Sequence, residues 1–134
     1  MILKSRYNES ILEFSNFINT GTDHPFIQFD IEFHHNGFNV KRPIQAEPLD
    51  LQELLEGFNN LNQNLKGSFQ FEPISYEISI KFEINDSGHI DVNGWIKNDN
   101  QTLTLLFNFQ TDQTFLPELI SQCIKMRDLY KGFI

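Results

Sequence analysis

The sequence has one cysteine, Cys123, so it cannot form an internal disulfide. It has no continuous apolar run approaching the ~18 residues that a membrane-spanning helix needs. The opening residues Met1–Arg6 lack the apolar stretch of a secretory signal. A glycine-rich phosphate loop is also missing, because Gly57 and Gly67 occur without the Gly-x-Gly or Gly-Lys-Ser spacing. We therefore expect a cytoplasmic protein that does not bind a membrane.

Basic residues are scarce: 10 Lys and Arg stand against 18 Asp and Glu, which gives a formal charge of -8. Such a field repels a phosphate backbone and attracts a basic partner, so we do not expect direct nucleic-acid binding. The alternative that the charge only maintains solubility stays open. The 134 residues suit a single domain over residues 1–134, and the 14 Phe indicate an aromatic-rich core. A monomer or a weak dimer is expected.

Apolar and polar residues alternate with the period of a strand in several segments. The most regular begins at Tyr76, and a turn at Asp86–Gly88 then predicts a hairpin, in whose second strand Gly94 suggests a bulge. Asn36-Gly37 predicts another hairpin. The predicted strands are Ile11–Ile18, Ile27–His34, Phe38–Arg42, Phe69–Phe71, Tyr76–Asn85, Ile90–Ile96 and Leu103–Phe109, with Leu3–Tyr7 as a further, weaker candidate.

Two segments have helical periodicity instead. Leu51 to Leu65 forms an apolar stripe, and Asp50 with Glu53 three residues later resembles a capping box at its start. A second stripe runs from Phe115 to Tyr130. The order is strands, helix, strands, helix. It predicts an α+β fold, in which a largely antiparallel β-sheet of about seven or eight strands has two amphipathic α-helices packed on one face.

Three groups of residues could carry chemistry, and for each a structural role is the simpler interpretation. His34 and His35 are adjacent, but consecutive strand side chains point to opposite faces and cannot share an ion. The run Asp86-Ser87-Gly88-His89 reads as a turn, and Cys123 lies on an apolar helix stripe. We predict no catalytic residue, metal site or cofactor, although the many carboxylates leave a paired-acid hydrolase open.

One surface stands out. If Ile90, Val92 and Ile96 face the core, Asp91 and Trp95 lie on the opposite face of the sheet, beside Glu77 and Glu83 of the paired strand. Trp is enriched at binding hot spots, so these four residues are candidate partner-binding residues. Two alternatives are that a loop or terminal strand covers Trp95, or that Gly94 bulges it into the core. The acidic approach to the first helix, with Glu53 and Glu56, is the second candidate, and a solvated helix face would also explain it.

The C-terminal half resembles a known family. The run Gly88-His89-Ile90-Asp91-Val92-Asn93-Gly94 is followed by Leu105-Leu106-Phe107-Asn108-Phe109-Gln110-Thr111-Asp112-Gln113-Thr114-Phe115-Leu116. This pattern is similar to that of the WapI-like immunity proteins of bacterial toxin systems, and the similarity extends upstream over most of the chain. None of these positions is catalytic in character.

The resemblance implies a cytosolic antitoxin, without enzymatic activity, that binds and neutralises the C-terminal domain of a cognate toxin. Such domains are often nucleases, and a nuclease is basic where it holds nucleic acid, so an acidic antitoxin could mask that surface. Two other function classes stay open: a carrier of an apolar small molecule with a Phe-rich pocket, and a weak hydrolase with an unrecognised carboxylate pair.

Overall fold

The computed structural model describes residues 1–19 and 26–130, and within these ranges the chain forms eight strands and two α-helices. The predicted α+β class and the order strands, helix, strands, helix are confirmed. The elements are β1 (Ile2–Lys4), β2 (Ser10–Asn19), β3 (Ile27–His35), β4 (Phe38–Ala46), α1 (Pro48–Asn64), β5 (Ser68–Phe71), β6 (Ile78–Ile84), β7 (His89–Lys97), β8 (Thr104–Asp112), a 3₁₀ turn (Gln113–Phe115) and α2 (Leu116–Asp128).

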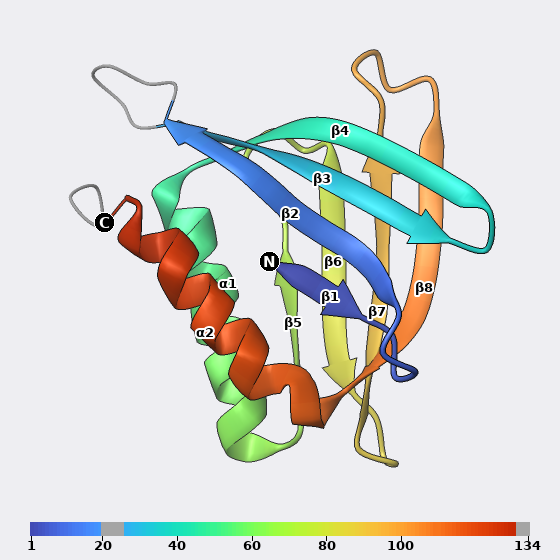
Figure 1. Cartoon of the computed structure of the whole chain (residues 1–134), viewed down its shortest axis with the longest axis vertical. Coiled ribbons are helices and arrows are strands. Elements are labelled where there is room, and N and C mark those ends of the chain that lie inside the picture. Colours follow the sequence, from blue (N-terminus) through green and yellow to red (C-terminus); the bar gives the residue numbers. More distant parts are fainter. Residues whose placement is uncertain (20–25, 131–134) are drawn as a thin grey trace.

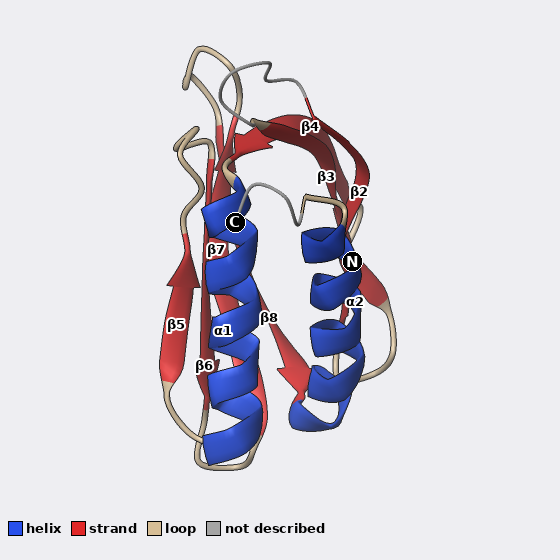
Figure 2. Ribbon diagram, turned by 90° about the vertical axis from the view of Figure 1, so that its left-hand side faces the viewer, coloured by secondary structure: helices blue, strands red, loops and turns tan. Residues whose placement is uncertain are grey.

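The strands form two four-stranded antiparallel sheets. The N-terminal sheet has the order β1-β2-β3-β4 and the C-terminal sheet the order β5-β6-β7-β8. Figure 1 shows the N-terminal sheet in front of the C-terminal sheet, with the helices along one side of both. Figure 2 shows α1 on the side of the C-terminal sheet and α2 on the side of the N-terminal sheet. The antiparallel pairing and the strand number agree with prediction, and the structure adds the division into two layers.

Aromatic rings fill the space between the layers. Phe14 stacks on Phe29 within the N-terminal sheet, with ring centroids 5.3 Å apart. Phe33 of that sheet meets Phe107 of the C-terminal sheet at 5.1 Å, which joins the two layers directly. These side chains are buried among a larger set of Ile and Leu residues, so the predicted aromatic-rich core is confirmed.

Helix α1 packs on the C-terminal sheet, where the Phe58 ring lies edge-on to Phe82 of β6 at 5.0 Å. It begins earlier than predicted: Glu47 is the N-cap, and its N–H donates to Asp50 Oδ2 at 2.7 Å. The capping box therefore pairs Glu47 with Asp50, and the predicted pairing of Asp50 with Glu53 is wrong. Pro48 permits this start, because the first turn of a helix leaves N–H groups unbonded and proline has none to lose.

Helix α2 packs on the other layer. Gln122 Oε1 accepts a hydrogen bond from the Ile2 N–H at 2.8 Å, so the last helix lies against the first strand. Asp112 precedes this helix and accepts from the Thr114 N–H at 3.0 Å, which caps the 3₁₀ turn. The apolar stripe extends to Tyr130, which is buried as predicted. Neither of the helices in the described residues is long and apolar enough to cross a membrane.

Several apolar residues at or near the ends of the predicted elements are exposed, among them Tyr76 and Leu65. Tyr76 precedes β6 with a left-handed backbone (φ 55°), and 69% of its surface is exposed. Leu65 ends α1 in the same conformation (φ 53°) and is also exposed. Tyr76 lies two residues before β6 and Leu65 one residue after α1, and periodicity alone does not fix where such an element ends.

Candidate interaction surface

The face of the C-terminal sheet that points away from the core is called the outer face here. The unbroken registers of β6, β7 and β8 align its side chains in rows across the strands. One row contains Glu83, Asp91 and Gln110, and the row two residues away contains Lys81, Asn93 and Asn108. The next row contains Ser79, Trp95 and Leu106.

Trp95 lies on the outer face, half-buried, between Ser79 and Leu106. The Lys97 ammonium lies over its indole ring, 4.5 Å from the ring centroid, so a neighbouring cation shares this ring. The alternative that a bulge turns Trp95 into the core is wrong, because the register of β7 continues through Gly94 with both neighbouring strands.

Gly94 has a packing role instead of a bulge. A Cβ atom built at this position would lie 2.3 Å from the backbone oxygen of Ser79 and 2.7 Å from Cζ of Phe107. The backbone of β6 and the Phe107 ring therefore leave no room for a side chain at position 94. A missing side chain and a bulge give the same gap in a hydrophobic pattern, which explains the wrong prediction.

The three acidic residues predicted on this face have different surroundings. Asp91 accepts from Gln110 Nε2 at 2.9 Å, which holds the carboxylate in place. Glu83 is exposed. Glu77 lies 3.4 Å from the Arg42 guanidinium, which also meets Asp99 at 2.6 Å, so part of the charge of Glu77 is neutralised within the protein. The sequence did not indicate this contact, because Arg42 belongs to the other sheet.

The second predicted candidate, Glu53 and Glu56, lies elsewhere. Both residues are on the exposed side of α1, whose opposite side packs against the inner face of the C-terminal sheet. Glu56 accepts from Gln52 one turn earlier at 3.2 Å. The outer face and the exposed side of α1 are therefore two separate surfaces. A partner can contact one of them without contacting the other.

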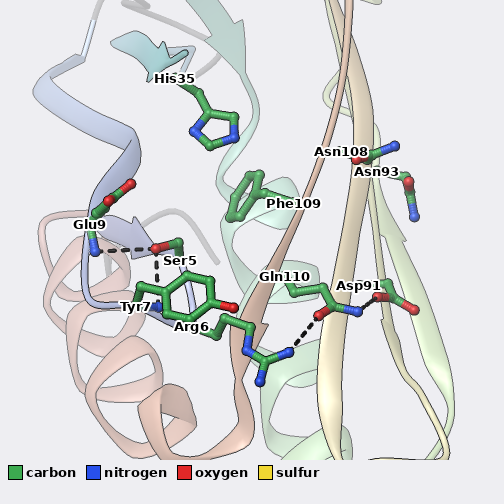
Figure 3. A pocket seen from close by; sticks show the side chains of 10 residues that line it. All are labelled: Ser5, Arg6, Tyr7, Glu9, His35, Asp91, Asn93, Asn108, Phe109 and Gln110. Atoms are coloured by element: carbon green, nitrogen blue, oxygen red, sulfur yellow. Dashed lines mark hydrogen bonds between the residues drawn. The ribbon is translucent and has the colours of Figure 1, made fainter.

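A hollow of about 580 Å³ lies beside β8, at the rim of the outer face, and sequence reasoning missed it. Figure 3 shows Ser5, Arg6, Tyr7 and Glu9 on one side of it, with Asp91, Asn93, Asn108 and Gln110 on the other. Arg6 Nη1 donates to Gln110 Oε1 at 3.2 Å across its floor. No local pattern could predict it, because residues 5–9 on one side and residues 91–110 on the other are far apart in the sequence.

The residues that could carry chemistry have structural partners. His34 contacts Glu32 at 2.8 Å on the outward side of β3, whereas His35 turns toward Phe33 and the hollow. The Ser87 hydroxyl donates to Asn85 Oδ1 at 2.6 Å within the turn. Within residues 1–19 and 26–130 there is no group of three or more His, Cys, Asp or Glu able to hold a metal ion.

The protein shifts the pKa values of Cys123 and Asp112 in opposite directions. Burial raises the pKa of the Cys123 thiol to about 12, so a nucleophilic thiolate does not form near neutral pH. The Thr114 N–H that bonds to Asp112 holds the pKa of this carboxyl below its usual value, so Asp112 is a carboxylate that serves as a cap.

The two open alternatives receive little support from the described residues. A paired-acid hydrolase needs two desolvated carboxyls in a cleft. The hollow holds Glu9 and Asp91, but Glu9 is exposed and Asp91 is bonded to Gln110. A carrier needs an apolar pocket lined by Phe. Phe33, Phe38 and Phe107 do line a hollow of about 240 Å³ beside β8, but it is smaller than the roughly 300–1,000 Å³ of a ligand pocket, and Phe38 is exposed to solvent. The buried Phe14 ring packs against Phe29 and Phe71 and leaves no pocket there.

Comparison with known proteins gives one family. The family model described as "Immunity protein WapI-like family" matches residues 5–131. No curated protein matches the chain. Among solved structures, the chain is similar to one described as "Crystal structures of trypanosoma bruciei MRP1/MRP2", with 8% sequence identity and a TM-score of 0.47, over 86% of this chain and 76% of that chain. The family match includes the outer face and both helices.

Proposed function

The chain belongs to the WapI-like family of immunity proteins, and on this premise we propose that it binds a cognate bacterial toxin domain in the cytoplasm and neutralises it without any catalysis of its own. The observation that carries the proposal is the family match over residues 5–131, which leaves almost none of the chain outside the family. The residues described above as candidates for chemistry have structural roles, which agrees with a protein that acts by binding.

Charge suggests the kind of toxin. At a formal charge of -8 the protein attracts a basic partner and repels nucleic acid. A nuclease domain has a basic surface that holds its phosphate substrate. An acidic protein that covers this surface would prevent substrate binding, and we therefore propose a basic, nuclease-type toxin domain as the partner.

The outer face is the proposed contact surface, with Trp95 as anchor and Asp91, Glu77 and Glu83 as its acidic surroundings. A half-buried Trp on a strand paired on both sides loses little side-chain entropy when a partner covers it, and Trp is among the residues that dominate binding energies. Glu83 is the most available of the three acids, since Glu77 is paired with Arg42 and Asp91 with Gln110. Glu53 and Glu56, on the far side of the sheet, would mainly steer the encounter.

The first experiment tests the function itself. The toxin domain encoded by the neighbouring gene is expressed in cells with and without this protein, and the purified pair is titrated by calorimetry. Growth in the presence of both, with a stable complex at micromolar concentration or below, is the expected result. A toxin that kills equally in both strains and shows no heat of binding would overturn the proposal.

The second experiment tests the surface. Trp95→Ala is expected to weaken toxin binding by at least ~2 kcal/mol, mostly through faster dissociation, whereas Trp95→Phe keeps an aromatic anchor and should lose less. Circular dichroism and melting curves check that both variants fold. If Trp95→Ala binds like the wild type, the outer face is not the interface.

Reversal of Glu53 and Glu56 to Lys provides the contrast. It is expected to slow association, with a smaller effect as salt rises, because exposed charges act over distances that ions screen. Glu118→Lys, at another exposed helix position on α2, is the matched control for each single reversal, Glu53→Lys or Glu56→Lys, because it makes the same change of charge. Loss of binding at every salt concentration in the Glu53 and Glu56 variant alone would show that α1 is the interface.

A further inference from the structure

The four edge strands of the two sheets are protected to very different degrees. An exposed strand edge offers unpaired backbone groups to other chains, and proteins normally guard it with charges, proline or short length. The β1 and β5 edges are three and four residues long. The β4 edge has Lys41, Arg42 and Pro43. The β8 edge is nine residues long, has no proline, and is uncharged from Thr104 to Thr111.

The backbone of β8 is open toward this edge. The Arg6 N–H donates to the Gln110 carbonyl at 2.7 Å, on the side of β8 that faces away from β7. Alternate residues of an antiparallel strand direct both backbone groups to the same side. Since the register with β7 is unbroken, Leu106 and Asn108 direct their N–H and C=O groups outward like Gln110. Among the described residues, no backbone group pairs with these four atoms.

Hollows and exposed side chains follow the same edge. A hollow of about 240 Å³ lies between β8 and the tip of the β3–β4 hairpin, lined by Leu106, Phe38 and Asn108. Phe38 and Leu106 are 64% and 75% exposed, although both are apolar. The larger hollow of Figure 3 continues from Asn108 to Gln110. The edge is therefore accessible along its length and has apolar side chains at one end.

Charge distinguishes between the occupants that could use this edge. The end of the groove at Gln110 has two carboxylates, Glu9 and Asp91, against one guanidinium, that of Arg6, which donates to the neutral Gln110 amide. A second copy of this chain would bring another formal charge of -8 to the same place. A segment with Lys or Arg at that end would be attracted instead. The acidic rim thus favours a basic partner over self-association.

We propose that an extended segment of the toxin domain adds to β8 as a fifth strand of the C-terminal sheet, pairing with Thr104 to Asn108. This inference rests on the proposed function and specifies how the partner docks. The segment has apolar side chains that meet Leu106 and Phe38, and a Lys or Arg that meets Asp91 and Glu9. At one end the pairing stops at Gln110, because the Arg6 N–H already donates to its carbonyl. At the other end it stops at the β7–β8 loop, where the Asn98 N–H donates to the Leu103 carbonyl.

Amide hydrogen exchange of the wild-type protein, free and bound to an inactive variant of the neighbouring gene's toxin domain, tests the pairing. The amides of Leu105 and Phe107 face β7 and are protected in both states. Strand addition predicts that exchange at Leu106 and Asn108 slows by at least about tenfold on binding, so that protection is gained at alternate residues. A partner that only covered the side chains would not produce this alternation.

Proline substitution gives an independent measure. Asn108→Pro removes the outward N–H while leaving the pairing with β7 intact, and Asn108→Ala removes the same side chain but keeps the N–H. Asn108→Pro is expected to bind the toxin domain about tenfold more weakly than Asn108→Ala. Equal binding by two folded variants overturns the inference, and if Asn108→Pro does not fold, the exchange experiment decides alone.

The outcomes separate this inference from the function on which it rests. A toxin domain that binds and is neutralised, without alternating protection in β8, overturns the strand addition and leaves the function standing. A toxin domain that does not bind the wild-type protein overturns both. Alternating protection in the free protein at high concentration, together with a dimer in sedimentation, would show that a second copy occupies the edge and would also overturn the inference.

Discussion

Phe82 tests the packing between α1 and the C-terminal sheet. Its side chain is fully buried, and its ring lies 4.8 Å from that of Phe69, stacked, and 5.0 Å from that of Phe58, edge-on. Truncation of a buried Phe to Ala costs about 3–5 kcal/mol, and each aromatic pair contributes about 0.5–1.5 kcal/mol beyond area alone. Because Phe82 loses two such pairs, the upper end of the range is expected. A chain of this length has a total stability of roughly 7–20 kcal/mol.

Urea unfolding followed by circular dichroism measures this loss. Phe82→Ala should lower the midpoint without a change of slope, because the slope reports the surface exposed on unfolding. The matched control is Phe38→Ala, the same truncation at a 64% exposed position, which should stay within about 0.5 kcal/mol of the wild type. Equal midpoints for Phe82→Ala and the wild type, at equal slopes, would refute the proposed packing of β6 under α1.

Two further predictions concern backbone fit and pH. Gly94→Ala should destabilise the protein by about 1–3 kcal/mol in the same urea assay, because its Cβ meets the Ser79 oxygen; a stable variant would mean that the strands separate easily. Asp112→Ala should cost about 1 kcal/mol at pH 7 through loss of the Thr114 cap. Since the folded pKa of Asp112 is lowered, this contribution is present above the ordinary carboxyl pKa and is lost as pH falls through the folded value, so melting curves of variant and wild type should converge in acid.

Much of the fold could be predicted because strand and helix periods differ. The alternation around Phe82 and the stripe around Phe58 identify elements whose burial the structure confirms. The division into two sheets could not be predicted in the same way. A pattern shows which face of a strand is buried, and it does not show that α1 interrupts the pairing between β4 and β5.

The sequence also predicts which surface side chains point outward, but it does not predict which residues they contact. Trp95 and Asp91 face outward as the alternation of β7 indicates. The pairing of Glu77 with Arg42, and the approach of Arg6 to Gln110, join segments far apart in the sequence. Such contacts depend on how the layers meet. The partner-binding role of Trp95, Asp91, Glu77, Glu83, Glu53 and Glu56 stays a prediction that the binding experiments address.

Each helix packs on the sheet formed by the other half of the chain. Helix α1 follows the N-terminal sheet in sequence but covers β6, and α2 follows the C-terminal sheet but lies against β1. Each half of the chain therefore supplies the cover for the apolar face of the other. A fragment cut between α1 and β5 would keep its hairpins and expose their hydrophobic side to water, so neither fragment gains enough from burial to offset its ordering entropy. The two halves should thus fold and unfold together in one cooperative step, and separate fragments should become ordered only when mixed.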